Sequence, residues 1–169
     1  MIAQIEGQLI SLGTESCLVK VGLVCYEVML ASYCVEALTG KVGSEITLCT
    51  MEYYEGSLGG GNLIPRMVGF LSSAEREFFK IYTSVKGIGI KKGLRSLSLP
   101  IASIATAIEN GDEKVLLTLP AIGSRMAQQI IAELFANCDQ AAQELGMDEP
   151  FIARVRQARH RLAGPQIGA

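Results

Sequence analysis

Two segments of this chain carry the same glycine-turn pattern at a fixed offset of 34 residues. The first reads TSVKGIGIKKGL from residue 83, and the second reads LTLPAIGSRMAQ from residue 117. In both, an isoleucine lies between two small residues, and a cation follows two residues after the second of these small residues. Apolar residues at helical spacing flank each turn, so each segment predicts a helix, a tight turn and a second helix. The chain is therefore expected to contain a helix-hairpin-helix twice.

The residue types in these turns suit a phosphate. Glycine permits a positive φ and lets a ligand approach the backbone closely. The free N–H groups and the dipole of the following helix favour an anion at the same spot, and nearby cations can reach its oxygens. The expected phosphate-binding positions are Gly87, Gly89, Lys91 and Lys92 in the first turn and Ala121, Gly123, Ser124 and Arg125 in the second.

The apolar and small residues of the two copies have a structural role. Ile88 and Ile122 are expected to anchor each turn in the core, and Gly93 and Ala127 to let the paired helices pack closely. A single copy could equally be an ordinary pair of helices with a glycine C-cap. Two copies in register, each with a cation, favour binding of both strands of a duplex through the backbone, without reading of bases.

The rest of the chain divides into segments that differ in the spacing of their apolar residues. Residues 1–70 contain five short segments with the composition of half-buried strands, separated by glycine turns, which predicts a five-stranded barrel of the OB-fold type. Residues 71–137 read as an all-helical domain that holds both hairpins. Residues 138–169 read as a linker and a short, arginine-rich helix over 150–163. The fold class is thus α+β, with two domains and a tail.

Charge and composition narrow the function classes. The net charge of −2 conceals a stretch, residues 80–108, with five cations and no acid, which is typical of a nucleic-acid footprint. Five scattered cysteines and one histidine argue against a metal site or a disulfide framework. No phosphate-binding loop ending in GK[ST] is present, so no ATPase site is expected. Neither a signal peptide nor an apolar run of membrane-spanning length is visible, so we expect a cytoplasmic protein that contacts no membrane.

Three segments together resemble the RuvA family, the Holliday-junction-binding subunits of bacterial RuvAB branch-migration complexes. They are MIAQIEGQLI at the start, VGFLSSAEREFFKIYTSVKGIGIKKGLRSL from residue 68 and LLTLPAIGSRMAQQIIAEL from residue 116, and the resemblance covers residues 1–137. It implies a homotetramer that holds a four-way DNA junction open for recombination and DNA repair in the response to DNA damage. It also implies that a RuvB-type AAA+ ATPase uses the ATP, so that this chain needs no cofactor and has no catalytic site. A RuvC-type resolvase is a further implied partner.

The chain departs from the family pattern in two places. The family carries an acidic pin on a loop between late barrel strands, where negative charge helps to separate DNA strands. Here the matching loop offers Glu55 as the first candidate and Glu52 as the second, without an adjacent acidic pair. The family also ends in a small three-helix domain that binds RuvB, and we expect the roughly 30 residues after Cys138 to be too few for a standard domain of this kind. Either the sequence is truncated, or the domain is reduced, or coupling to RuvB is lost or achieved in another way.

Three other functions remain open. The chain could bind duplex DNA without preference for a junction. It could be a helix-hairpin-helix DNA glycosylase, for which Glu133 and Asp139 are the first candidate catalytic acids after the second hairpin, although neither has the expected flanking pattern. It could also be a structural adaptor that binds no DNA, which the cations of both turns disfavour.

Overall fold

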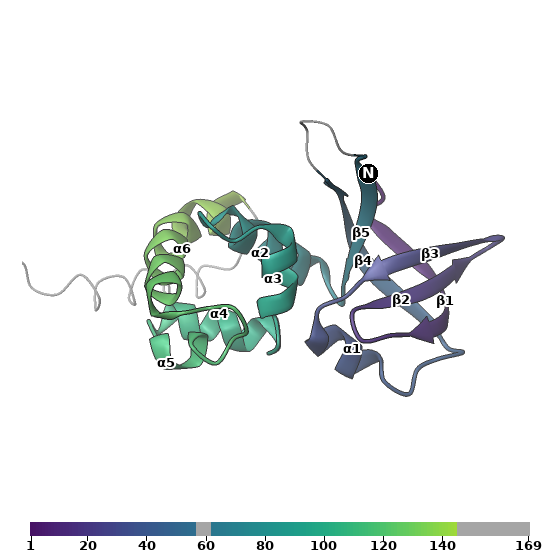
Figure 1. Ribbon diagram of the computed structural model, residues 1–169, viewed down its shortest axis with the longest axis horizontal. Coiled ribbons are helices and arrows are strands. Elements are labelled where there is room, and N and C mark those ends of the chain that lie inside the picture. The colour runs from purple at the N-terminus through teal and green to yellow at the C-terminus, as the bar shows by residue number, and fades with distance from the viewer. Residues whose placement is uncertain (57–61, 145–169) are drawn as a thin grey trace, which may run out of the picture. The chain divides into compact units, whose positions relative to one another are not determined.

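The structure is a computed structural model that describes residues 1–56 and 62–144, with side chains of the last helix described as far as residue 134. The chain forms two compact units, and the boundary between them in the sequence lies between Lys80 and Ile81. The first contains the strands and the second the helical hairpins (Figure 1). The expected domain limit at residue 70 is the last residue of the final strand, and as a domain boundary it stays a prediction.

The first unit is a closed five-stranded barrel with strand order β1-β2-β3-β5-β4. The strands are β1 Gln4–Leu12, β2 Ser16–Val21, β3 Val24–Met29, β4 Glu45–Glu55 and β5 Ile64–Phe70, with helix α1 Ser32–Leu38 between β3 and β4. All neighbouring strands are antiparallel except β3 and β5, which close the barrel in parallel. Alternate residues of β1 are buried, as period-two patterning requires. The predicted OB-fold-like barrel is confirmed.

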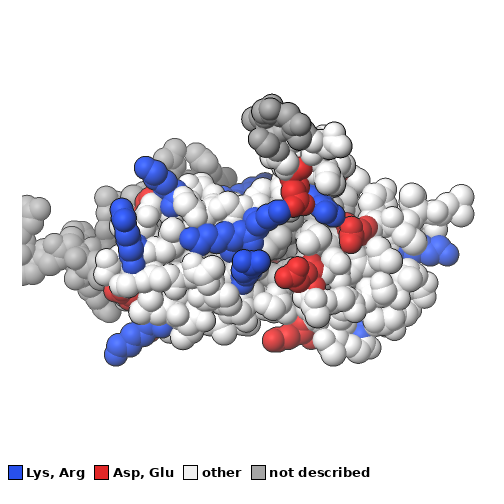
Figure 2. Space-filling model, in the orientation of Figure 1, with Lys and Arg blue, Asp and Glu red and all other residues white. Residues whose placement is uncertain are grey.

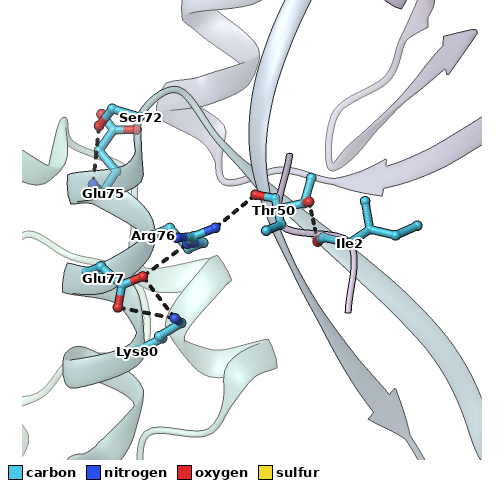
Figure 3. Close-up of polar contacts among 8 residues, drawn as sticks. Ile2, Thr50, Ser72, Glu75, Arg76, Glu77 and Lys80 are labelled. Carbon is cyan, nitrogen blue, oxygen red and sulfur yellow. Dashed lines mark hydrogen bonds and ion pairs between the residues drawn. The ribbon is translucent and has the colours of Figure 1, made fainter. Parts of the chain in front are cut away.

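The N-terminal residues are fastened to the barrel and to the start of helix α2, Ser73–Ser84. The Thr50 hydroxyl donates to the Ile2 carbonyl at 2.6 Å, and the Arg76 guanidinium donates to the Ala3 carbonyl at 2.8 Å (Figure 3). Arg76 and Lys80 also contact Glu77, at 3.1 and 2.9 Å. The hydrogen bond from Lys80, with that from Arg76, lowers the pKa of the Glu77 carboxyl.

Ser72 and Glu75 form a capping box at the start of α2, with one change of partner. The Glu75 N–H donates to the Ser72 hydroxyl at 3.2 Å, as expected for such a cap. The Glu75 carboxylate, however, accepts from the N–H of Leu71 at 2.9 Å and from the Tyr33 hydroxyl at 3.1 Å. The start of α2 is thereby held against α1 within the first unit.

The second unit packs five helical segments around an aliphatic core. After the last residues of α2 come α3 Ile90–Ser96, α4 Ile101–Glu109, α5 Glu113–Leu116 and α6 Ser124–Glu144. Leu97, Ile104, Leu116 and Ile130 are fully buried in this core. The expected anchors Ile88 and Ile122 are buried as well, and so are the small residues Gly93 and Ala127. The tandem hairpin arrangement predicted from the repeat is confirmed.

A buried hydrogen bond ties the two helices of the first hairpin together. The hydroxyls of Tyr82 on α2 and Ser96 on α3 lie 2.9 Å apart, and both side chains are fully buried. The Ser96 hydroxyl also lies 2.9 Å from the Gly93 carbonyl, to which it can donate. Burial raises the pKa of the Tyr82 phenol, so it stays protonated and can complete this chain of hydrogen bonds.

The two turns adopt the same backbone conformation at equivalent positions. Gly87 has φ +88° and Ala121 has φ +63°, and Ala121 is the only non-glycine residue with positive φ in the described residues. An L-residue is strained in this left-handed region, so Ala121 carries a cost that Gly87 does not. A Cβ at Gly87 would in addition lie 3.0 Å from the Met126 Cε.

Replacing Tyr82 with phenylalanine should lower the free energy of unfolding by about 1 kcal/mol, because the substitution removes one buried hydrogen bond. Thermal unfolding followed by circular dichroism measures the change. Tyr54→Phe is the matched control, because Tyr54 is 70% exposed and loses no buried partner. Equal stability of the Tyr82→Phe variant and the unaltered chain would contradict this role of the hydrogen bond.

Substitutions at the left-handed positions of the two turns should change the free energy of unfolding in opposite directions. Ala121→Gly should raise the free energy of unfolding by about 0.5 kcal/mol, since relief of the strained φ outweighs the greater entropy that glycine gives the unfolded chain. Gly87→Ala should lower it by about 1 kcal/mol or more for the reverse reason. Denaturant unfolding compares the two variants, and effects of the same sign would refute the equivalence of the turns.

Candidate nucleic-acid interface

Each hairpin turn leads directly into a helix. Gly89 is the N-cap of α3, with φ −87° and ψ 174°, and it has no side chain that could cap the helix. Gly123 takes the same place before α6, which begins at Ser124. The first N–H groups of an α-helix have no acceptor within the helix, so both sites offer donors to a ligand.

Neither Gly89 nor Gly123 is required by the packing of the chain. A Cβ at either position would meet nothing within 4 Å, and neither residue has a positive φ. Glycine is among the favoured N-cap residues, and at equivalent positions of both copies it also leaves open space in which an external group can approach the backbone. This absence of neighbours applies to the residues that the structure describes.

The predicted cations lie at the start of the same helices. Lys91 and Arg125 are exposed, and Lys92 is half-buried. Exposed cations project from the helical unit on the face drawn in Figure 2. Anions are favoured at such helix starts both by the dipole and by nearby cations, so the two turns form two similar candidate phosphate sites. The assignment of individual phosphate-binding residues stays a prediction.

Ser124 has a partner that the sequence did not reveal. Its hydroxyl donates to the Glu113 Oε1 at 2.7 Å, and the Gln128 amide lies 3.4 Å from the same carboxylate. Only the N–H of Ser124 is therefore left for a ligand in this arrangement. Glu113 lies 11 residues earlier, on the first helix of the hairpin, where the antiparallel return of the chain brings it opposite Ser124.

The two turns are joined through side chains of α6. The Glu133 carboxylate accepts from the Lys86 N–H at 3.1 Å, and the Gln129 amide donates to the Lys86 carbonyl at 3.0 Å. Gln129 also donates to Glu133 at 2.7 Å. Glu133, a candidate acid for the glycosylase hypothesis, is thus bound to backbone in this structure. The side chain of Asp139, the other candidate, lies outside the described residues.

Both candidate pin acids of the barrel are paired with cations. The Glu55 carboxylate, at the end of β4, accepts from the Arg66 Nε at 2.9 Å, and Arg66 also lies 3.4 Å from Glu27. The hydrogen bond to Glu55 raises the pKa of Arg66. Glu52 accepts from the Ile2 N–H at 3.0 Å and lies 3.9 Å from the N-terminal amine of Met1. Much of the negative charge expected at this loop is therefore balanced.

Sequence reasoning missed Arg66, although the strand register contains the signal for it. Arg66 of β5 pairs with Tyr53 of β4, which makes Glu55 its diagonal neighbour on the same face. Residues 57–61 of the loop and the predicted basic helix 150–163 lie outside the described residues.

Two further searches cover the described part of the chain. No group of three or more His, Cys, Asp or Glu residues there could hold a metal ion. Within the same residues, no helix has the length and apolar character needed to cross a membrane.

Comparison with known families divides the chain as the structure does. The RuvA N terminal domain matches residues 1–55, and the SAM-like helix-hairpin-helix tandem matches residues 79–134. The first match lies on the barrel, and the second spans both hairpin turns. The two matched families thus correspond to the two structural features described above.

Curated relatives match across both units, and each is named a Holliday junction branch migration complex subunit RuvA. The protein of Rhodopirellula baltica is 39% identical over 134 residues, which are 79% of this chain and 65% of the relative. That of Desulfatibacillum aliphaticivorans is 36% identical over 162 residues, 96% of this chain and 78% of the relative. The protein of Desulforapulum autotrophicum is 32% identical over 149 residues, which are 86% of this chain and 68% of the relative. The chain thus spans just under two thirds of the first relative and somewhat more of the other two, and it belongs to the RuvA family.

Proposed function

We propose that this chain binds four-way DNA junctions through their backbone phosphates and holds them open for branch migration by an ATP-driven motor. The observation that carries the proposal is the pair of equivalent helix starts, each preceded by a glycine that the packing does not require. Two such sites on one unit suit the two strands of a duplex arm. Curated relatives that share both units are named as subunits of a Holliday junction branch migration complex.

The proposal includes the partners that membership of the RuvA family implies. A homotetramer would present one pair of hairpins to each of the four arms. A RuvB-type AAA+ ATPase would supply the motor and use the ATP, so this chain would act as a non-catalytic subunit without a cofactor. A RuvC-type resolvase would act on the same junction. We place the proposed junction binding in the cytoplasm, where a bacterial chromosome is found.

A second function is favoured by one observation. Because Arg66 neutralises Glu55, the barrel offers less repulsion to DNA than a free acidic pin would. A chain with working hairpins and a weakened pin could bind linear duplex as tightly as a junction. Gel shifts with a synthetic four-way junction and with a linear duplex of equal length, at near-physiological salt, separate the two functions. Clear preference for the junction supports the first, and equal affinity supports the second.

Charge reversal in both turns tests the phosphate sites. Lys91→Glu combined with Arg125→Glu should weaken junction binding at least about 100-fold, because two charge-assisted contacts become repulsive. The slope of log affinity against log salt concentration should fall by about 2. The matched control is Lys41→Glu with Lys114→Glu, which changes the net charge equally outside the turns. Equal losses of junction affinity in both double variants would mean that the change in net charge, and not the loss of contacts at the turns, weakens binding.

The two open glycines give a test that separates binding from folding. Gly89→Ala with Gly123→Ala should change the free energy of unfolding by no more than about 1 kcal/mol, because each Cβ has space and an ordinary φ. Junction affinity should fall about tenfold, since each methyl group would stand between the backbone and a phosphate.

Gly40→Ala is the contrasting control for the glycine test. Gly40 has φ +81° and lies in a loop of the barrel, so this substitution should lower the melting temperature and leave DNA binding unchanged. Full junction affinity in the Gly89→Ala and Gly123→Ala double variant would show that no ligand approaches these glycines.

A further inference from the structure

The two hairpin turns differ at the residue before the left-handed position. This residue is Lys86 in the first turn and Pro120 in the second, at the same offset of 34. Proline fixes its own φ near −65° and has no N–H that needs an acceptor. Pro120 therefore stiffens the second turn from within, whereas Lys86 leaves the first turn with a freer φ and an extra N–H donor.

In the first turn, side chains of α6 hold the backbone in place instead. Glu133 accepts from the Lys86 N–H at 3.1 Å, and Gln129 donates to the Lys86 carbonyl at 3.0 Å. The Gln129 amide also contacts Glu133 at 2.7 Å, so each side chain holds the other in place. Both polar groups of the Lys86 backbone are bound from one helix, and we call this arrangement the α6 clamp.

The placement of the α6 clamp links the two turns. Helix α6 begins at the second turn, and residues 126, 129 and 133 follow one another along one face of it. Met126 lies beside Gly87, close enough that a Cβ there would be 3.0 Å from its Cε. One rigid helix therefore starts at one candidate phosphate site and fixes the backbone beside the other.

The charge of Glu133 favours a structural role over contact with DNA. An acid on a unit that binds phosphates repels its ligand and lowers affinity. Its carboxylate nevertheless lies next to the first turn, where it accepts two hydrogen bonds. The repulsion is offset if the acid prevents the turn from moving, because a site held in its bound conformation binds more tightly.

We propose that Gln129 and Glu133 are positioning residues that hold the first hairpin turn in its phosphate-binding conformation and couple it to the second. This inference rests on the proposed binding of DNA phosphates by the turns. Neither residue needs to touch DNA. Their effect passes through the backbone of Lys86 to the N–H groups at the start of α3.

Two substitutions of Glu133 separate positioning from charge. Glu133→Ala in the full chain should weaken junction binding about five- to tenfold, because the first turn loses its acceptor. Glu133→Gln should bind more tightly than Glu133→Ala, since the amide oxygen still accepts from Lys86 and one negative charge is removed, although its NH2 group can no longer accept from Gln129. Gln129→Ala should weaken binding by a smaller factor. Gel shifts with the four-way junction measure all three.

Glu109→Ala is the control for net charge, because it removes an acid from α4 of the same unit. It should bind the junction as tightly as the unaltered chain or slightly more so. If Glu133→Ala and Glu133→Gln both strengthen binding to the extent that Glu109→Ala does, Glu133 acts only as a charge and the proposal is overturned.

Hydrogen exchange of the Lys86 amide, followed by NMR without DNA, tests the clamp independently. Glu133→Ala should speed this exchange at least about tenfold, and Glu133→Gln, which keeps an acceptor for the Lys86 N–H, should speed it less. Faster exchange with unchanged junction affinity would overturn the coupling to binding. If the unaltered chain binds neither junction nor duplex, the proposed function fails and the positioning role with it, while the exchange data still report whether the clamp exists.

Discussion

A helix that begins directly after a tight turn leaves its first N–H groups without acceptors in its own backbone, and this constraint governs the helical unit. In α3 and α6 the N-cap residue is a glycine, which brings no side chain to satisfy those donors. Buried Ile88 and Ile122 anchor both turns, so the donors cannot withdraw into the core. Water or an external anion must therefore supply the acceptors, and the rest of the unit serves to keep two such sites in place.

The pattern repeated at an offset of 34 residues was enough to predict both hairpins, because every residue type in it acts locally. The isoleucine at the centre of each turn is apolar and packs into the core. The small residues that follow it lie where the paired helices are in close contact. The barrel was predictable for a similar reason, since period-two alternation in β1 decides which face is buried. Local physics thus accounts for the fold class and for the order of the elements.

The contacts that tune the site could not be predicted in the same way. Glu133 and Lys86 are 47 residues apart, and Glu55 and Arg66 face each other only because β4 and β5 pair in one particular register. A sequence pattern describes an acid or a cation but not its partner across the fold. The prediction of Glu55 as the first pin candidate did not include its partner Arg66, and the prediction of Ser124 as a phosphate-binding residue did not include its partner Glu113. Charge balance is a tertiary property, whereas the turns themselves are a local one.

Closure of the barrel has a consequence for how copies of this chain can associate. Strand β5 pairs with β3 on one side and with β4 on the other, so the sheet returns on itself. Closure is nevertheless local, because β3 pairs with β5 only through Met29 and Val68, and β1 pairs with β4 only as far as Cys49. Beyond that point β4 and β5 continue as a two-stranded ribbon, whose outer edges pair with no third strand in the described part of the chain. A neighbouring molecule could pair with such an edge as well as pack against the side chains beside it. Substitutions on the ribbon could therefore change how copies associate without any change to the hydrogen bonds that close the barrel.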